Sequence, residues 1–239
     1  MLAPVTLLPS YSPSSASETA DMTDFPAQTS LRSDLLDQEA TAPARPALRV
    51  VHESDGIDLA AAEAAAGRFL DALGVDTASE SLRGTPGRMA RAYAELFSPR
   101  PFDLTTFPND EGYDELVLAR RIPVRTVCEH HLLPVVGVAH VGYLPGARIL
   151  GLSKLARVVE HFACRPQVQE RLTKQVAEWL QTQLEPKGVG VVIEAEHSCM
   201  TLRGVQATGS DTLTSTLLGL LRSDARSRSE FLALTRVTS

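Results

Sequence analysis

Apolar residues recur at helical spacing in two early segments of the chain. In the first, the stripe ends at Gly74 and consists of Ile57, Leu59, Ala62, Ala66, Phe69, Leu70 and Leu73. In the second, Thr85 is the expected N-cap and Pro86 the first helical residue, ahead of an apolar stripe of Met89, Ala90, Tyr93, Leu96 and Phe97. The pattern therefore predicts two helices, followed by a proline-rich loop over residues 99–110.

Closely spaced β-branched residues dominate the middle of the chain and predict strands. The expected strands cover residues 115–127, 134–143, 147–152, 189–193 and 212–218. A turn at Leu144-Pro145-Gly146 separates the second strand from the third. The strand over 189–193 is apolar throughout, which is typical of a buried strand, and it leads into Glu196-His197-Ser198-Cys199.

Three further helices are interleaved with these strands. The first of these helices is expected to be capped by Ser153. The second is expected to begin at Pro166 and to end near Leu184. A short helix around residues 230–234 closes the chain. The resulting order of helices and strands predicts an α+β fold with an antiparallel sheet, because strands and helices do not alternate as in βαβ folds. The glycine-rich signatures of Rossmann and P-loop nucleotide sites do not occur in the sequence.

Composition divides the chain into three parts. Residues 1–52 are rich in Pro, Ser and Ala without apolar periodicity, so we expect a disordered tail there. Residues 53–110 form the predicted N-terminal helical region, and residues 111–239 the sheet-containing domain with the candidate chemistry. The chain has 239 residues of which 44% are hydrophobic, enough to build a real core.

Charge and cysteine content restrict the function classes. A formal net charge of -6 gives no global attraction to nucleic acid or to an anionic membrane, so we expect neither as a partner. There is no apolar run of about eighteen residues and no basic N-terminal region, so neither a transmembrane helix nor a signal peptide is expected. Three cysteines indicate no disulfide framework and fit a reducing, cytoplasmic location.

A cysteine and a histidine stand three residues apart at the end of a predicted strand. Cys128 and His131 could both face one ion. A third candidate ligand, Cys199, follows at the end of another predicted strand. Thiolate and imidazole are good zinc ligands, and three protein ligands leave a fourth position open, as in catalytic zinc sites. The alternative is that the two cysteines are ordinary small buried residues.

Two histidines flank these candidate ligands. His130 precedes His131, and His197 lies two residues before Cys199. Imidazole titrates near neutrality, so both are candidates for proton transfer beside a metal. A structural role for each is the alternative.

Basic residues gather at the start of the helix predicted from Ser153. Its unpaired N–H groups, together with Lys154 and Arg157 on one helix face, could bind phosphate, and Arg203 could add a further cation. A solvated charged face is the alternative. Glu170 stands in the first turn of the next helix, where the helix dipole alone favours a carboxylate; it could also accept two N–H bonds from a guanine-like edge.

Four motifs in order resemble the GTP cyclohydrolase I family. They are Val127-Cys128-Glu129-His130-His131, Gly151-Leu152-Ser153-Lys154, residues 165–173, and His197-Ser198-Cys199 with Arg203-Gly204-Val205. The resemblance covers about residues 59–236. It implies the tunnelling fold, in which antiparallel sheets and paired helices assemble into a toroidal homodecamer or other toroid, with sites between subunits.

The resemblance also implies residue roles. The zinc ligands would be Cys128, His131 and Cys199, and the proton-transfer residues His130 and His197. Glu170 would anchor guanine, with Gln169 next to it. The triphosphate would be held by Ser153, Lys154, Arg157 and Arg203, and Arg91 falls where the family carries a basic residue near the phosphates.

The implied reaction is zinc-dependent hydrolysis of GTP to 7,8-dihydroneopterin triphosphate and formate, the first step of pterin and tetrahydrofolate biosynthesis. Water attacks C8, the imidazole ring opens, formate leaves, and an Amadori rearrangement precedes ring closure. Two alternatives stay open: another tunnelling-fold enzyme acting on a pterin or deazapurine, and a non-catalytic zinc-bound oligomer. The intact His130, His197 and Glu170 argue against the last of these, because a scaffold needs none of them.

Overall fold

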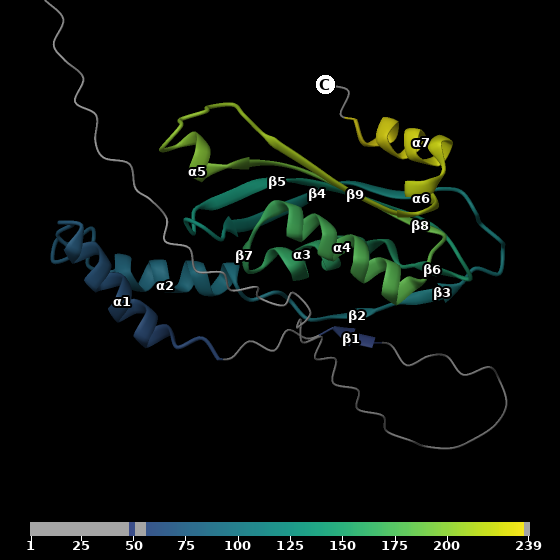
Figure 1. Cartoon of the computed structure of the whole chain (residues 1–239). Coiled ribbons are helices and arrows are strands. Elements are labelled where there is room, and N and C mark those ends of the chain that lie inside the picture. The colour runs from purple at the N-terminus through teal and green to yellow at the C-terminus, as the bar shows by residue number, and fades with distance from the viewer. Residues whose placement is uncertain (1–47, 51–55, 237–239) are drawn as a thin grey trace, which may run out of the picture. The chain divides into compact units, whose positions relative to one another are not determined.

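The computed structural model of the chain describes residues 48–50 and 56–236 (Figure 1). The tail predicted over residues 1–52 therefore lies, apart from residues 48–50, outside the described residues. Within the described ranges, no helix is both long and apolar enough to cross a membrane.

A five-stranded sheet is the centre of the fold. Its strand order is β7-β4-β5-β8-β9. The long strands pair antiparallel and are β4 (Val117–Cys128), β5 (Pro134–Leu144), β8 (Gly188–His197) and β9 (Thr212–Gly219). The antiparallel sheet predicted from the β-branched pattern is confirmed.

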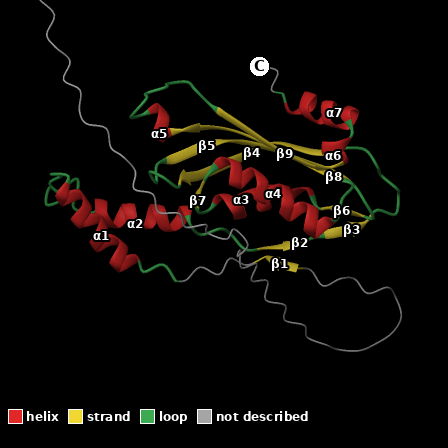
Figure 2. Ribbon diagram, in the orientation of Figure 1, coloured by secondary structure: helices red, strands yellow, loops and turns green. Residues whose placement is uncertain are grey.

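Two helices, α3 (Leu152–Ala163) and α4 (Gln169–Leu184), cover one face of this sheet (Figure 2). They bury aliphatic side chains against the inward positions of the strands. The fully buried members include Leu155, Val159, Leu172, Val176, Leu180, Val141, Val191 and Ile193. Burying a large aliphatic side chain contributes about 1.5–3 kcal/mol, so this face provides the main stabilisation of the fold.

The other face of the sheet holds a smaller core beneath α6 (Leu220–Ser223) and α7 (Ala225–Thr235), on the side opposite α3 and α4 (Figure 1). Phe231 of α7 is fully buried there. Its ring lies over Gly142 and Gly190, which are direct cross-strand partners on β5 and β8. The two glycines leave the space that the ring occupies.

The N-terminal helices α1 (Leu59–Ala72) and α2 (Thr85–Leu96) form as predicted, with small shifts at their ends. Asp58 caps α1, since its carboxylate accepts from the Ala61 N–H at 2.9 Å. Gly74 follows the helix with a φ of 77°, a conformation that glycine adopts without steric cost. The N-cap of α2 is Gly84 rather than the predicted Thr85.

The prediction of a loop over residues 99–110 is wrong, because this segment contains two short strands. β2 (Phe102–Leu104) pairs with β1 (Leu48–Val50), and β3 (Thr106–Pro108) pairs with β6 (Arg148–Leu150). These partners are forty or more residues apart in sequence; Thr106 and Arg148, whose side chains are hydrogen-bonded, are 42 residues apart. A local pattern of prolines therefore does not reveal the pairing.

The starts of α3 and α4 also differ from the prediction. The N-cap of α3 is Gly151, so Ser153 lies inside the first turn and does not cap the helix. Pro166 does not open α4, because Pro166–Gln167 form β7, which pairs parallel to the end of β4. The helix begins at Gln169 after an extended Val168.

We expect Gly190→Ala to lower the free energy of unfolding by about 1–3 kcal/mol, as overpacking of a core does. A Cβ at this position would lie 2.6 Å from Cζ of Phe231, so the ring or the strand must shift. Urea denaturation followed by circular dichroism measures the effect. The matched control is Gly67→Ala in α1, whose Cβ would meet only Pro86 Cγ at 3.9 Å; equal losses in both variants would contradict the prediction.

Asp224 is expected to make the docking of α7 dependent on pH. Its carboxylate caps α7, and hydrogen bonds from the backbone and then the side chain of Ser227 lower its pKa. A lowered pKa contributes stability that is present above the unfolded value of about 3.9 and is lost as pH falls through the folded value. The stability difference between wild type and Asp224→Ala should thus be full at neutral pH and shrink at pH 3; a difference independent of pH would refute this role.

Candidate metal centre

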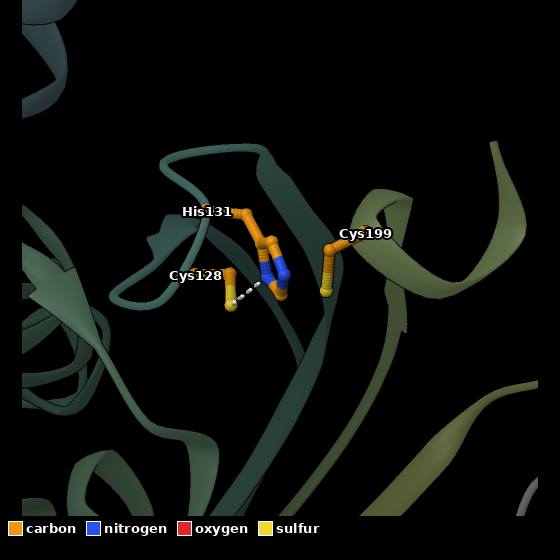
Figure 3. Close-up of side chains that lie close together, drawn as sticks. All are labelled: Cys128, His131 and Cys199. Atoms are coloured by element: carbon orange, nitrogen blue, oxygen red, sulfur yellow. Dashed lines mark hydrogen bonds between the residues drawn. The ribbon is translucent and has the colours of Figure 1, made fainter. Parts of the chain in front are cut away.

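Three side chains from two distant parts of the chain converge at one end of the sheet (Figure 3). Cys128 is the last residue of β4, His131 lies in the turn to β5, and Cys199 belongs to α5 (Ser198–Thr201), directly after β8. Their possible ligand atoms all lie within 4.8 Å of one another. The structure thus brings together the three ligands predicted from the sequence.

Backbone hydrogen bonds fix the turn that carries two of these residues. Cys128 N–H donates to Leu133 O at 2.8 Å, and Leu132 N–H donates to Cys128 O at 2.7 Å. Leu132 has a φ of 53°, which reverses the chain within a few residues. Cys199 reaches the same point because His197 at the end of β8 pairs with Val135 near the start of β5.

The donor set fits a metal ion such as zinc. Cys128 Sγ lies 3.8 Å from His131 Nδ1, and tetrahedral zinc with bonds of about 2.3 Å to sulfur and 2.0–2.1 Å to nitrogen separates the two donors by about 3.5 Å. Burial, and then the neighbouring Cys128 sulfur, raise the pKa of the Cys199 thiol. A cation would therefore have to displace a proton from this thiol on binding.

Both predicted proton-transfer histidines lie near the ligands. His130 is exposed, and its Nδ1 is 3.8 Å from Cys128 Sγ. His197 is half-buried, and its Nε2 is 2.7 Å from Oε1 of Gln169. Burial lowers the pKa of His197, and the nearby Glu170 carboxylate opposes that shift. A lowered pKa favours the uncharged form of the His197 ring.

Of the first two residues of α4, Gln169 is buried in the protein and Glu170 is exposed to solvent. Glu170 is exposed, beside His197. Gln169 is only 5% exposed, and its amide nitrogen donates to Ile193 O at 3.0 Å and Thr212 O at 2.8 Å. A carboxylate open to solvent and a buried amide thus lie next to each other at the start of one helix.

The residues predicted to bind phosphate lie in two separate parts of the structure. Arg203, in the segment after α5, places Nη1 3.4 Å from His131 Nε2, so it lies at the cluster. Ser153 and Lys154 lie in the first turn of α3, whereas the end of α3 leads into β7 beside Cys128. A helix of 12 residues is about 18 Å long. The structure therefore does not bring Ser153 and Lys154 to the cluster of the same chain.

Arg157 and Arg91 complete the predicted set. Arg157 pairs with Glu160 at 3.2 Å, and the same carboxylate accepts two bonds from Arg100 at 2.6 Å and 2.7 Å. Hydrogen bonding from Arg100 lowers the pKa of Glu160. Arg91 is exposed on α2, the helix that contacts the ligand turn through a bond from the Tyr93 hydroxyl to Leu132 O at 3.0 Å.

An ion pair that the sequence did not reveal ties the ligand turn to α4. The Arg171 guanidinium bonds to the Glu129 carboxylate and donates through Nε to Gln167 Oε1 at 3.0 Å. The bond from Arg171 lowers the pKa of Glu129. Both residues belong to conspicuous motifs, but they are 42 positions apart and nothing in their spacing indicates contact.

Comparisons with known proteins point to one family. The family described as GTP cyclohydrolase I matches residues 62–236. GTP cyclohydrolase 1 of Aquifex aeolicus is 51% identical over 168 residues, covering 70% of this chain and 91% of the relative. The Streptomyces griseus protein of the same name is 53% identical over 178 residues, which cover 72% of this chain and 88% of the relative. GTP cyclohydrolase 1 of Mycobacterium leprae is 49% identical over 205 residues, which cover 84% of this chain and 97% of the relative.

We expect Cys199→Ala to weaken Zn²⁺ binding by more than about 100-fold, since even residues that merely support ligands contribute 10- to 100-fold. The matched control is Cys164→Ala, because Cys164 is the remaining cysteine and lies half-buried at the end of α3, outside the cluster. Metal analysis after equilibrium dialysis against Zn²⁺ checks both variants. Retention of zinc by Cys199→Ala, or equal loss by Cys164→Ala, would refute the ligand assignment.

Proposed function

Because the chain belongs to the GTP cyclohydrolase I family, we propose that it hydrolyses GTP to 7,8-dihydroneopterin triphosphate and formate with the help of zinc. Family membership also confirms the predicted tunnelling fold, here seen as an antiparallel sheet with the paired helices α3 and α4. The observation that carries the proposal is the meeting of Cys128, His131 and Cys199 at one end of the sheet. A solely structural metal would not require the two histidines and the carboxylate beside it.

Zinc held by these three residues would supply Lewis acidity and lower the pKa of water enough for hydrolysis at neutral pH. The chain's own residues provide the rest of the chemistry. Opening the imidazole ring of guanine needs a proton acceptor for the attacking water and a proton donor for the departing nitrogen. We assign these transfers to His130 and His197, because His130 lies beside Cys128 and the lowered pKa of His197 favours an uncharged ring that can accept a proton.

Recognition of the purine is assigned to Glu170. Its carboxylate is exposed at the N-terminal end of α4, on the same side as His197. Two carboxylate oxygens can accept from two neighbouring N–H groups, which matches the edge of guanine formed by N1 and the 2-amino group. Adenine lacks this pair of donors, so Glu170 favours guanine nucleotides.

The positions of the cations support sites shared between subunits. Arg203 adjoins the cluster of its own chain, whereas Ser153 and Lys154 lie at the far end of α3. We therefore assign Ser153, Lys154 and Arg157 to the triphosphate of a GTP molecule bound at the cluster of a neighbouring copy. Arg91 is proposed to contribute through α2.

Unpaired strand edges supply the means of such assembly. In the part of the chain that the structure describes, β9 bonds only to β8, and β4 pairs on its outer side only through Val127 and Cys128. Long open edges are templates for pairing with another chain. Pairing of β9 with β4 of the next copy would extend the sheet around a closed ring, as expected for a toroidal homo-oligomer.

The direct test is formate release from GTP by the purified protein, with zinc content measured on the same sample. We expect formate to appear in step with GTP loss and to cease when a chelator removes zinc. Zinc bound without formate release would preserve the metal centre and reject the hydrolase, in favour of another purine-like substrate or a non-catalytic oligomer.

His197→Ala should retain zinc and assembly but lose turnover by about 100-fold or more, the usual contribution of a proton-transfer residue. His161→Ala is the matched control, because His161 lies on α3 and packs against Phe162 of the same helix and Phe102 of β2, outside the cluster. Kinetics of formate release, together with metal analysis and size-exclusion chromatography, separate these effects. Full turnover in His197→Ala would remove this residue from the mechanism.

A further inference from the structure

Gln169 is the buried residue in direct contact with His197. It opens α4 and is 5% exposed. Its amide nitrogen faces three acceptors: Ile193 O at 3.0 Å, Thr212 O at 2.8 Å and Thr214 Oγ1 at 3.2 Å. Its amide oxygen faces Nε2 of His197 at 2.7 Å. Every polar atom of the side chain therefore has a partner within the protein.

The chemistry of these partners fixes which way round the amide lies. Two of the three acceptors are backbone carbonyl oxygens, which can accept but never donate. The NH₂ group must therefore face Ile193 and Thr212, and the carbonyl oxygen must face His197. A flipped amide would place oxygen against oxygen twice in a buried position, which is strongly unfavourable.

A pair of threonine hydroxyls supports the same orientation. The Thr173 hydroxyl donates its proton to the backbone oxygen of Gln169 at 2.7 Å. Thr214 Oγ1, which is 2.6 Å from Thr173 Oγ1, must then be the donor between the two hydroxyls. Its lone pairs remain available to accept from the Gln169 amide, whose two hydrogens can point to Ile193 O and Thr212 O with Thr214 Oγ1 as a shared acceptor.

The fixed amide in turn determines the tautomer of His197. An amide oxygen only accepts, so Nε2 of His197 must carry the hydrogen of the 2.7 Å bond. In the neutral ring the lone pair then resides on Nδ1. We propose, resting on the function proposed above, that Gln169 is a positioning residue that holds His197 as the Nε2–H tautomer and makes Nδ1 the nitrogen that exchanges protons during GTP hydrolysis.

This role differs from the substrate contact that the sequence suggested for Gln169. A residue that binds GTP directly raises KM when it is removed, whereas one that orients a proton-transfer group lowers kcat. The neighbouring Glu170 has no such internal partners in the described structure and is exposed, so it stays the purine contact. The two adjacent residues thereby serve different steps.

The first experiment is nitrogen-15 NMR of the histidine rings of the full-length protein, with His197 assigned by comparison with His197→Ala. At about pH 8.5, two units above the ordinary histidine pKa, we expect a protonated-nitrogen signal for Nε2 and an unprotonated one for Nδ1. The opposite tautomer, or an even mixture, overturns the proposal. This measurement needs no turnover: the expected tautomer without formate release would reject the proposed reaction alone.

The second experiment compares Gln169→Met with Gln181→Met. Gln181 lies on the same helix about 18 Å away, and its side chain donates to Pro186 O, so it controls for loss of a half-buried glutamine. We expect Gln169→Met to reduce kcat about 10- to 100-fold, with KM for GTP and zinc content within about twofold of wild type. A raised KM with unchanged kcat would restore Gln169 to the substrate contacts and overturn the positioning role.

Discussion

The register of β5 against its two neighbours is the constraint on which the metal centre depends. Val127 pairs with Pro134 on one side, and Val135 pairs with His197 on the other. These pairings place the end of β4, the start of β5 and the end of β8 at one point. A slip of one residue on either side would turn each side chain to the opposite face of the sheet. The three candidate metal ligands would then no longer converge, so the aliphatic core that stabilises this register also assembles the cluster.

The same end of the sheet contains a polar network within an otherwise aliphatic core. Gln169 and Thr173 are almost fully buried, yet each finds partners on β8 or β9. A satisfied buried network is rigid because every alternative arrangement leaves a donor or acceptor unpaired. This rigidity extends to the partly buried His197, while Glu170, the proposed purine contact, stays in solvent. The two proposed roles, orientation of His197 and recognition of the purine, thus belong to neighbouring residues of one helix turn.

Charge distribution explains how an acidic chain binds a polyanion. The formal net charge of -6 repels phosphate at long range, so binding relies on local cations. Arg203 lies at the cluster, while Lys154 lies at the other end of α3. In an assembly closed through the edges of β4 and β9, cations of one copy would meet the cluster of the next. Turnover of GTP would then depend on assembly, because a single copy would lack part of the proposed phosphate site.

The sequence alone was enough to predict the order of the long helices and strands, the antiparallel class of the sheet, and the three side chains that meet in the candidate metal centre. These depend on periodicity and on residue types that few other roles require, such as Cys128 and His131 at a strand end. Only the tertiary structure revealed the short strands β2, β3 and β7, the Glu129–Arg171 pair, and the position of Lys154 far from the cluster. The physical reason is that each depends on partners distant in the chain, whose proximity arises from packing and strand register. Gln169 illustrates the difference: the family resemblance implied a substrate contact for it, whereas the fold shows that its side chain contacts His197.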